Sequence, residues 1–163
     1  MGMVYLMCGM AAAGKTTFAK KIAAETGAIR YTLDERMIAK YPNVTIMDDE
    51  VYGGLVHDER KLIWEEAKEE LANGRDVILD WSLWNPTLRQ LWIGRVQDAG
   101  HDYKLFYLER TIDQLWQRLE KRNGDETAVA HEIPYEELVR FAEFFQPPTA
   151  EENLNLQIVP WGE

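Results

Sequence analysis

Short apolar runs alternate along this chain with longer stretches of helical periodicity. The apolar runs predict strands at residues 3–8, 28–32, 77–79, 103–108 and 154–159. Because these runs are apolar at nearly every position, they are typical of parallel strands that are covered on both faces. The alternation therefore predicts an α/β fold, a three-layer α/β/α sandwich around a parallel sheet.

Helices are expected between the apolar runs, from Lys15 to near Gly27, at 58–73, at 85–100, at 111–123 and from 134 to before 147. The start of the third helix is the best defined, because Asn85 is a capping residue and Pro86 follows it in the first turn. The sequence contains no internal repeat and no linker. Residues 1–163 are therefore predicted to form a single domain.

The segment between the first strand and the first helix has the phosphate-binding loop pattern Gly9-x4-Gly14-Lys15-Thr16, also called Walker A. Its glycines let backbone N–H groups converge on a phosphate, and the helix that follows points its positive dipole end at the same charge. Lys15 can then reach the β- and γ-phosphates of ATP, and the Thr16 hydroxyl can ligate Mg²⁺. We expect a nucleoside triphosphate to bind Gly9, Met10, Ala11, Ala12, Ala13, Gly14, Lys15, Thr16 and Thr17.

Composition narrows the possible partners. The chain of 163 residues has a net charge of −10, whereas proteins that bind nucleic acid usually carry a basic face, so a nucleic-acid partner is disfavoured without being excluded. No apolar run approaches the roughly 20 residues that a membrane-spanning helix needs. The single cysteine, Cys8, cannot form an internal disulfide and is expected to be buried in the first strand. These features favour a cytoplasmic protein.

Two aspartates follow predicted strands, and ligands of an open parallel sheet bind at the carboxyl ends of its strands. Asp80, after an apolar run, has the form of a Walker B carboxylate that holds Mg²⁺ or orients the acceptor. Asp34 could accept the proton of an attacking hydroxyl as a general base. Alternatively, Asp34 caps a helix that begins at Glu35, and Asp80 caps a turn.

Arg118 and Arg122 lie one helical turn apart and share a face of their predicted helix. They precede a polar segment that is expected to form a mobile lid at about residues 122–133. Arginines that a closing lid delivers can neutralise charge on a transferring phosphoryl group. The alternative is a solvated basic stripe that pairs with neighbours such as Glu120.

Residues that could bind the acceptor are less clearly marked: Arg36, Trp81, Trp84 and Arg89. The two tryptophans lie just after Asp80, where they could wall a flat or apolar substrate, although packing in the core explains them at least as well. The other tryptophans on predicted helices are expected in the core: Trp64, Trp92 and Trp116.

Several motifs in this order resemble a known group: the phosphate loop, Leu33-Asp34-Glu35-Arg36, Val77-Ile78-Leu79-Asp80, Arg89, and Arg118-x3-Arg122 before Pro147-Pro148. The chain resembles the small P-loop kinases labelled AAA-family ATPases, which are related to polynucleotide kinase, zeta toxin and chloramphenicol phosphotransferase. The resemblance covers most of the chain and implies a five-stranded parallel sheet in the order 2-3-1-4-5. It also implies that Asp34 is the general base, that Arg118 and Arg122 are lid arginines, and loosely that Arg36 contacts the acceptor.

These observations predict an ATP-dependent kinase that uses Mg²⁺ and transfers the γ-phosphoryl group to a hydroxyl of a small molecule. One alternative is a polynucleotide 5′-hydroxyl kinase or a nucleoside kinase. An alternative of another class is an ATP-binding switch or ATPase that acts through a protein partner. The sequence leaves open the acceptor, the preference for ATP over GTP, and the oligomeric state.

Overall fold

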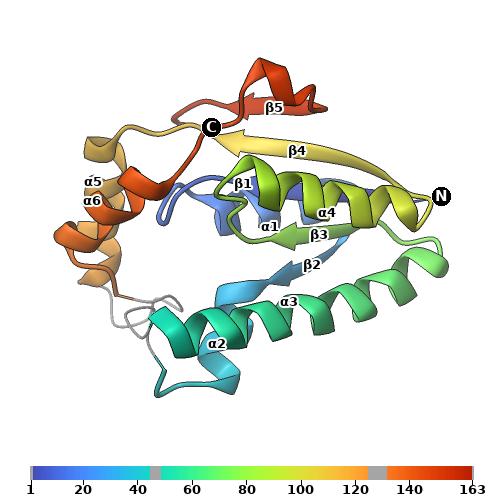
Figure 1. The fold of residues 1–163 in the computed structure, drawn as a ribbon, viewed down its shortest axis with the longest axis horizontal. Coiled ribbons are helices and arrows are strands. Elements are labelled where there is room, and N and C mark those ends of the chain that lie inside the picture. The colour runs from blue at the N-terminus through green and yellow to red at the C-terminus, as the bar shows by residue number, and fades with distance from the viewer. Residues whose placement is uncertain (1, 45–48, 125–131, 163) are drawn as a thin grey trace.

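A parallel sheet forms the centre of the molecule. The computed structural model describes residues 2–44, 49–124 and 132–162. Within these residues five parallel strands form one sheet in the order β2-β3-β1-β4-β5, which confirms the predicted fold and strand order (Figure 1). The strands are β1 (Met3–Cys8), β2 (Ile29–Thr32), β3 (Val77–Asp80), β4 (Asp102–Leu108) and β5 (Leu156–Val159).

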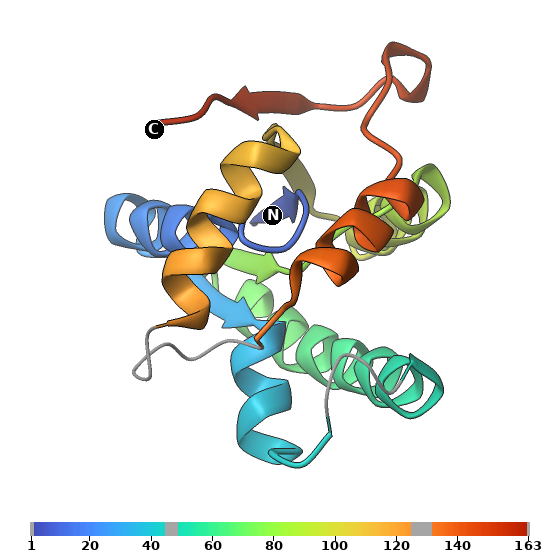
Figure 2. The same cartoon turned by 90° about the vertical axis from the view of Figure 1, so that its left-hand side faces the viewer.

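Helices cover both faces of this sheet, as the end-on view in Figure 2 shows. Helix α1 (Lys15–Thr26) lies on one face, and α3 (Asp49–Ala72) and α4 (Pro86–Asp98) lie on the other. Each face has its own apolar cluster. On the α1 side Phe18 packs edge-on against Phe106 of β4, with 4.9 Å between the ring centroids. On the other side Trp64 and Trp92 are buried, as predicted. Trp116, which packs against the cluster on the α1 side, is only half-buried.

The remaining helices gather at the carboxyl ends of the strands. In Figure 1 the strand arrows point toward the end of the molecule where α2 (Leu33–Lys40), α5 (Ile112–Asn123) and α6 (Tyr135–Phe144) lie. This is the end at which parallel sheets bind their ligands. No helix in the described parts of the chain has both the length and the apolar character that crossing a membrane requires.

Helix starts follow local capping chemistry where a capping residue is present. The Asn85 side chain accepts a hydrogen bond of 2.9 Å from the backbone N–H of Leu88, and Pro86 occupies the first turn of α4, as predicted. Thr111 and Gln114 form a capping box at the start of α5. These reciprocal bonds satisfy N–H groups that would otherwise lack partners.

Helix α3 is longer than predicted, because it begins at Asp49 and not at residue 58. Its first half contains Gly53 and Gly54, which weaken the helical signal in the sequence. Tertiary packing compensates for them, since Val56 is buried and Tyr52 and Leu55 pack against the same apolar cluster. Strands β2 and β5 also begin one or two residues later than predicted, at Ile29 and Leu156.

Arg89, predicted to bind the acceptor, instead lies in the interior of the fold. Its side chain is 0% exposed, and its Nε and Nη2 atoms donate to the carboxylate of Glu152 at 2.7 and 3.0 Å. Its Nη1 atom donates to the carbonyls of Leu83 and Gln146, both at 2.8 Å. Arg89 therefore ties α4 to the loop after β3, to the segment after α6, and to the short helix at Ala150–Glu152 that precedes β5.

Replacing Arg89 with methionine should lower the free energy of unfolding by about 3–5 kcal/mol, because Glu152 would stay buried without its counter-charge. Arg75→Met is the matched control, since Arg75 pairs with Glu70 at the surface, where solvent screens the interaction. Chemical denaturation measures both variants against the wild type. Equal unfolding midpoints for the two variants would contradict the anchoring role of Arg89.

Candidate functional site

The phosphate-binding loop runs from the end of β1 to the start of α1. Its backbone takes the left-handed conformation at Ala12 (φ 65°) and at Gly14 (φ 97°), which turns the chain tightly before the helix begins. Gly9 allows a close approach, since a Cβ there would lie 3.3 Å from the carbonyl oxygen of Leu108. No described side chain caps α1, and its first turn holds no acidic residue. Its first N–H groups are therefore available to an anion.

Lys15 is folded back over this loop. Its Nζ atom donates to the carbonyl oxygens of Gly9 and Met10, at 3.1 and 2.8 Å. Burial lowers the pKa of Lys15, and the charges of Asp80 and Asp34 oppose that effect. The ammonium group thus lies between the loop and the carboxylates of the site.

Asp80 ends β3 next to the loop and is 3% exposed. Its Oδ2 atom accepts hydrogen bonds from the hydroxyls of Thr16, at 2.7 Å, and Thr32, at 2.8 Å. Burial raises the pKa of Asp80, while the bond from Thr16 and the charge of Lys15 lower it. A carboxylate and a hydroxyl at this distance are the hard oxygen donors that Mg²⁺ prefers, so Thr16 and Asp80 fit the metal predicted for them.

Asp34 is an exposed residue in the first turn of α2, directly beyond β2. The N-cap position of α2 is Thr32, so Asp34 lies inside the helix and the capping interpretation does not hold. The charge of Asp34 acts on five ionisable groups in which burial has the larger effect: burial lowers the pKa of the three cations and raises the pKa of the two acidic groups. The charge of Asp34 raises the pKa of all five: Lys15, Tyr52, Arg60, Asp80 and Arg122.

Arg118 and Arg122 project from α5 toward the same end of the sheet. Arg118 is exposed and approaches the loop so closely that a Cβ on Gly14 would lie 3.5 Å from its Nη2 atom. Burial lowers the pKa of Arg122. The negative charge of Asp34 raises this pKa, and the positive charge of Arg118 lowers it further. The structure therefore places both arginines around the loop and Asp34. Their role at a phosphoryl group stays a prediction.

Most of the predicted lid lies outside the described residues. The two ends that the structure does describe are joined by Asn123. The Asn123 side chain donates to the carbonyl oxygen of Ile133 at 2.9 Å and accepts from its N–H at 3.2 Å. This pair holds the last residue of α5 beside Ile133, which lies just before α6.

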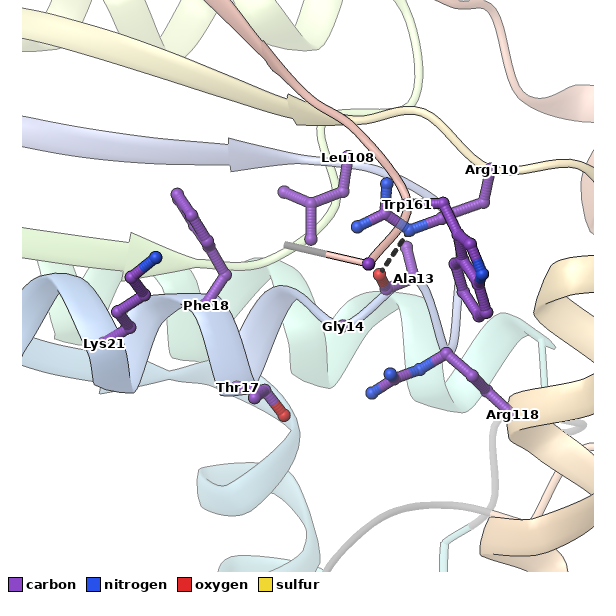
Figure 3. A pocket seen from close by; sticks show the side chains of 10 residues that line it. Ala13, Gly14, Thr17, Phe18, Lys21, Leu108, Arg110, Arg118 and Trp161 are labelled. Carbon is purple, nitrogen blue, oxygen red and sulfur yellow. Dashed lines mark hydrogen bonds between the residues drawn. The ribbon is translucent and has the colours of Figure 1, made fainter.

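A cavity of about 360 Å³ opens beside the loop, lined by Gly14, Thr17, Lys21, Arg110, Arg118 and Trp161 among others (Figure 3). Arg110 is fixed there, because its Nε donates to the carbonyl of Ala13 at 3.1 Å and its Nη1 to that of Val159 at 2.7 Å. Its guanidinium lies 5.5 Å from the ring centroid of Trp161. An aromatic ring beside two arginines can stack on a flat base.

Arg110 and Trp161 were not predicted to belong to the site. Arg110 had a usable signal, since it follows the fourth strand at the carboxyl end of the sheet, where Asp34 and Asp80 follow theirs. Trp161 had none. It reaches the loop because the segment after β5 turns back over Gly14, as Figure 3 shows.

Two of the predicted acceptor residues have structural partners instead. Arg36 forms a two-pronged ion pair with Glu66, both contacts at 2.7 Å, and its Nη1 also contacts Glu59 at 3.3 Å. Trp84 packs edge-on against Phe141 of α6 at 5.4 Å. The prediction that Arg36 and Trp84 contact the acceptor therefore lacks support, because neighbouring helices occupy these side chains.

Trp81 is packed in the core, as one of the two interpretations of the sequence held, with 4% exposure and its ring 5.0 Å from that of Trp92. The indole Nε1 atom is shielded from solvent and has no hydrogen-bond partner among the described residues. On its other side the guanidinium of Arg60 lies 6.0 Å from the ring centroid. Trp81 thus contacts both the core, through Trp92, and the guanidinium of Arg60.

This fold and its loop define a P-loop kinase-like protein. Residues 4–148 match the family described as an AAA domain, and the chain belongs to that family. No sequence among the curated proteins matches the chain.

Solved structures share the fold at low identity. A gluconokinase from Sinorhizobium meliloti 1021 has 17% identity and a TM-score of 0.64 over 99% of this chain and 83% of that one. Chaetomium thermophilum Kti12 in complex with ADP-AlF3 has 14% identity and a TM-score of 0.73 over 98% and 89%. A chain of the Pnkp1/Rnl/Hen1 RNA repair complex has 18% identity and a TM-score of 0.69 over 87% and 43%.

The thiol of Cys8, directly before the loop, should be unreactive in the folded protein. Cys8 is fully buried, as predicted, and burial raises its pKa to about 11, so little thiolate exists at neutral pH. We expect an aromatic disulfide reagent to modify Cys8 at pH 7 only after denaturant is added. Prompt modification of the native protein, at the rate seen in denaturant, would contradict this burial.

Proposed function

We propose that this protein is an ATP-dependent kinase that transfers the γ-phosphoryl group to a hydroxyl of a small molecule. The position of Asp34 is the observation that carries the proposal. An exposed carboxylate follows β2, within electrostatic range of Lys15 and Asp80. A nucleotide switch has no need of an exposed carboxylate there, whereas a kinase needs a base beside the γ-phosphate.

In the proposed reaction the acceptor oxygen forms a bond to the γ-phosphorus, and the bond from that phosphorus to the β–γ bridging oxygen breaks. The hydroxyl proton passes to Asp34, and ADP leaves. Lys15 and the N–H groups of the loop hold the phosphates, and Arg118 and Arg122 neutralise the charge that develops on them. Thr16 and Asp80 would hold Mg²⁺, which neutralises charge across the β- and γ-phosphates.

In this proposal the nucleobase lies in the cavity beside the loop, which Arg110, Arg118 and Trp161 line. Its triphosphate then extends over Gly14 to Lys15. Two similarities in fold support the binding of a nucleotide and a kinase function, one to a gluconokinase and one to Kti12, whose structure holds ADP-AlF3.

The direct test is Mg²⁺-dependent formation of ADP from ATP, with and without pooled acceptors. The pools hold nucleosides, sugars and sugar acids, aminoglycoside- and chloramphenicol-like alcohols, and a 5′-hydroxyl oligonucleotide. A large stimulation by a small-molecule pool supports the proposal, and stimulation by the oligonucleotide alone would make the protein a polynucleotide kinase. Slow turnover that no pool changes would favour a switch that acts through a protein partner.

Asp34→Asn should lower the rate of transfer about 10²–10⁴-fold and leave ATP affinity nearly unchanged, because only proton removal is lost. Lys15→Ala should abolish transfer by removing the contact to the β- and γ-phosphates. Glu35→Gln is the control, since Glu35 lies next to Asp34 but pairs with Arg30. Steady-state kinetics with a nucleotide-binding assay measures all three variants. Wild-type transfer by the Asp34 variant would remove Asp34 from the role of base.

Binding of Mg²⁺ and ADP should change the fluorescence of Trp161, which is 41% exposed and lines the cavity. Trp161→Ala should raise the Kd for ADP about tenfold, because base stacking is lost. Trp116→Phe serves as the control, since Trp116 packs against Tyr135. If Trp161→Ala kept both the fluorescence change and the affinity, the base would bind elsewhere.

A further inference from the structure

Arg60 is a positively charged residue near the site, and the proposed kinase reaction assigns it no role. It lies in α3, the helix that runs along the sheet face beside β3 (Figure 1). Its guanidinium is held over the ring of Trp81, 6.0 Å from the centroid, and Trp81 directly follows Asp80. Because Trp81 is itself fixed against Trp92, Arg60 has a defined place at the edge of the site.

The cations around Arg60 have carboxylate partners. Arg36 pairs with Glu66 at 2.7 Å, and Lys40 pairs with Glu59 at 2.9 Å. The Nε atom of Arg60 is shielded from solvent and has no hydrogen-bond partner within the described residues. A shielded guanidinium donor without an acceptor is costly unless a ligand supplies one.

The surroundings of Arg60 lead toward Asp34. Burial lowers the pKa of Arg60, and Tyr52 and Asp34 raise it, so the carboxylate that acts on Arg60 is the proposed base. The shielded Nε1 of Trp81 is a second donor without an acceptor among the described residues. Arg60 and Trp81 thus present two neighbouring donors that lack acceptors among the described residues, and an oxygen-rich anion would supply those acceptors.

We propose that Arg60 binds a carboxylate or phosphate group of the acceptor, so that the substrate is an anionic, hydroxylated small molecule. This inference rests on the proposed kinase function. The planar guanidinium offers parallel N–H donors that suit either anion. The anion would neutralise Arg60, and the hydroxyl of the same molecule would face Asp34. Neutral alcohols and unmodified nucleosides would leave Arg60 without a counter-charge and would be poor substrates.

The test compares six-carbon acceptors with and without an anionic group. Gluconate, the neutral polyol sorbitol and glucose 6-phosphate are assayed with the wild-type protein, Arg60→Met and Arg60→Lys. We expect activity on an anionic acceptor, with gluconate and glucose 6-phosphate distinguishing carboxylate from phosphate. Arg60→Met should raise the KM for that acceptor about 10- to 100-fold. Arg60→Lys should raise it less, because lysine keeps the positive charge but lacks the paired, planar N–H donors of arginine.

Arg95→Met is the matched control, because Arg95 also lies over a tryptophan, 4.6 Å from the ring centroid of Trp92. It removes an arginine–tryptophan contact in the last turn of α4, and its KM values should equal those of the wild type. Thermal unfolding of each variant separates a loss of folding from a loss of binding. Equal losses for sorbitol and for the anions in Arg60→Met would assign Arg60 a structural role and overturn the proposal.

A binding experiment separates failure of this inference from failure of the kinase assignment. Gluconate and glucose 6-phosphate are titrated calorimetrically into the wild-type and Arg60→Met proteins in the presence of ADP. One outcome is that an anion binds saturably to the wild type and not to Arg60→Met, while the wild type transfers no phosphoryl group. That outcome would support the anion site and contradict the kinase function. If phosphoryl transfer to sorbitol is as fast as transfer to the anions or faster, the protein is a kinase but Arg60 does not form an anion site.

Discussion

The buried carboxylate of Asp80 holds the site together. Its Oδ2 atom accepts one hydroxyl from Thr16, in the first turn of α1, and one from Thr32, at the end of β2. Burial of the carboxylate raises its pKa, so its charge is tolerated only because these hydroxyls and Lys15 stabilise it. The end of β3 is thereby joined to the phosphate-binding loop and to the strand that presents Asp34. A change at Asp80 would alter all three elements together.

Charged groups in this protein fall into two kinds, according to whether the fold supplies their partner. Arg89 is fully buried and has Glu152 and two carbonyl oxygens, so its charge is balanced within the fold. Arg36 is balanced in the same way by Glu66. Around Asp34, by contrast, the N–H groups at the start of α1 and the Nε of Arg60 have no such partner among the described residues. Unbalanced donors of this kind mark the places where a ligand supplies the opposite charge.

The sequence predicted the elements and the loop well because their signals are local. The run Met3–Cys8, the two glycines of the loop and the Asn85-Pro86 pair each act through neighbours a few residues away. The first half of α3 was not predicted, because Gly53 and Gly54 weaken the local signal and the packing of Val56 restores the helix only in the folded protein.

The sequence by itself determined that a phosphate-binding loop lies at the carboxyl end of a parallel sheet, with Asp34 and Asp80 after neighbouring strands. Only the tertiary structure decided which arginines form ion pairs with carboxylates. The sequence marked Arg36 and Arg89 as candidates and did not single out Arg60, yet Arg36 and Arg89 contact carboxylates and Arg60 lies over the ring of Trp81. Likewise, only the return of the chain after β5 brings Trp161 to Gly14. The physical reason is that capping and strand formation depend on residues nearby in the chain, whereas the pairing of a charge depends on residues that folding brings from elsewhere.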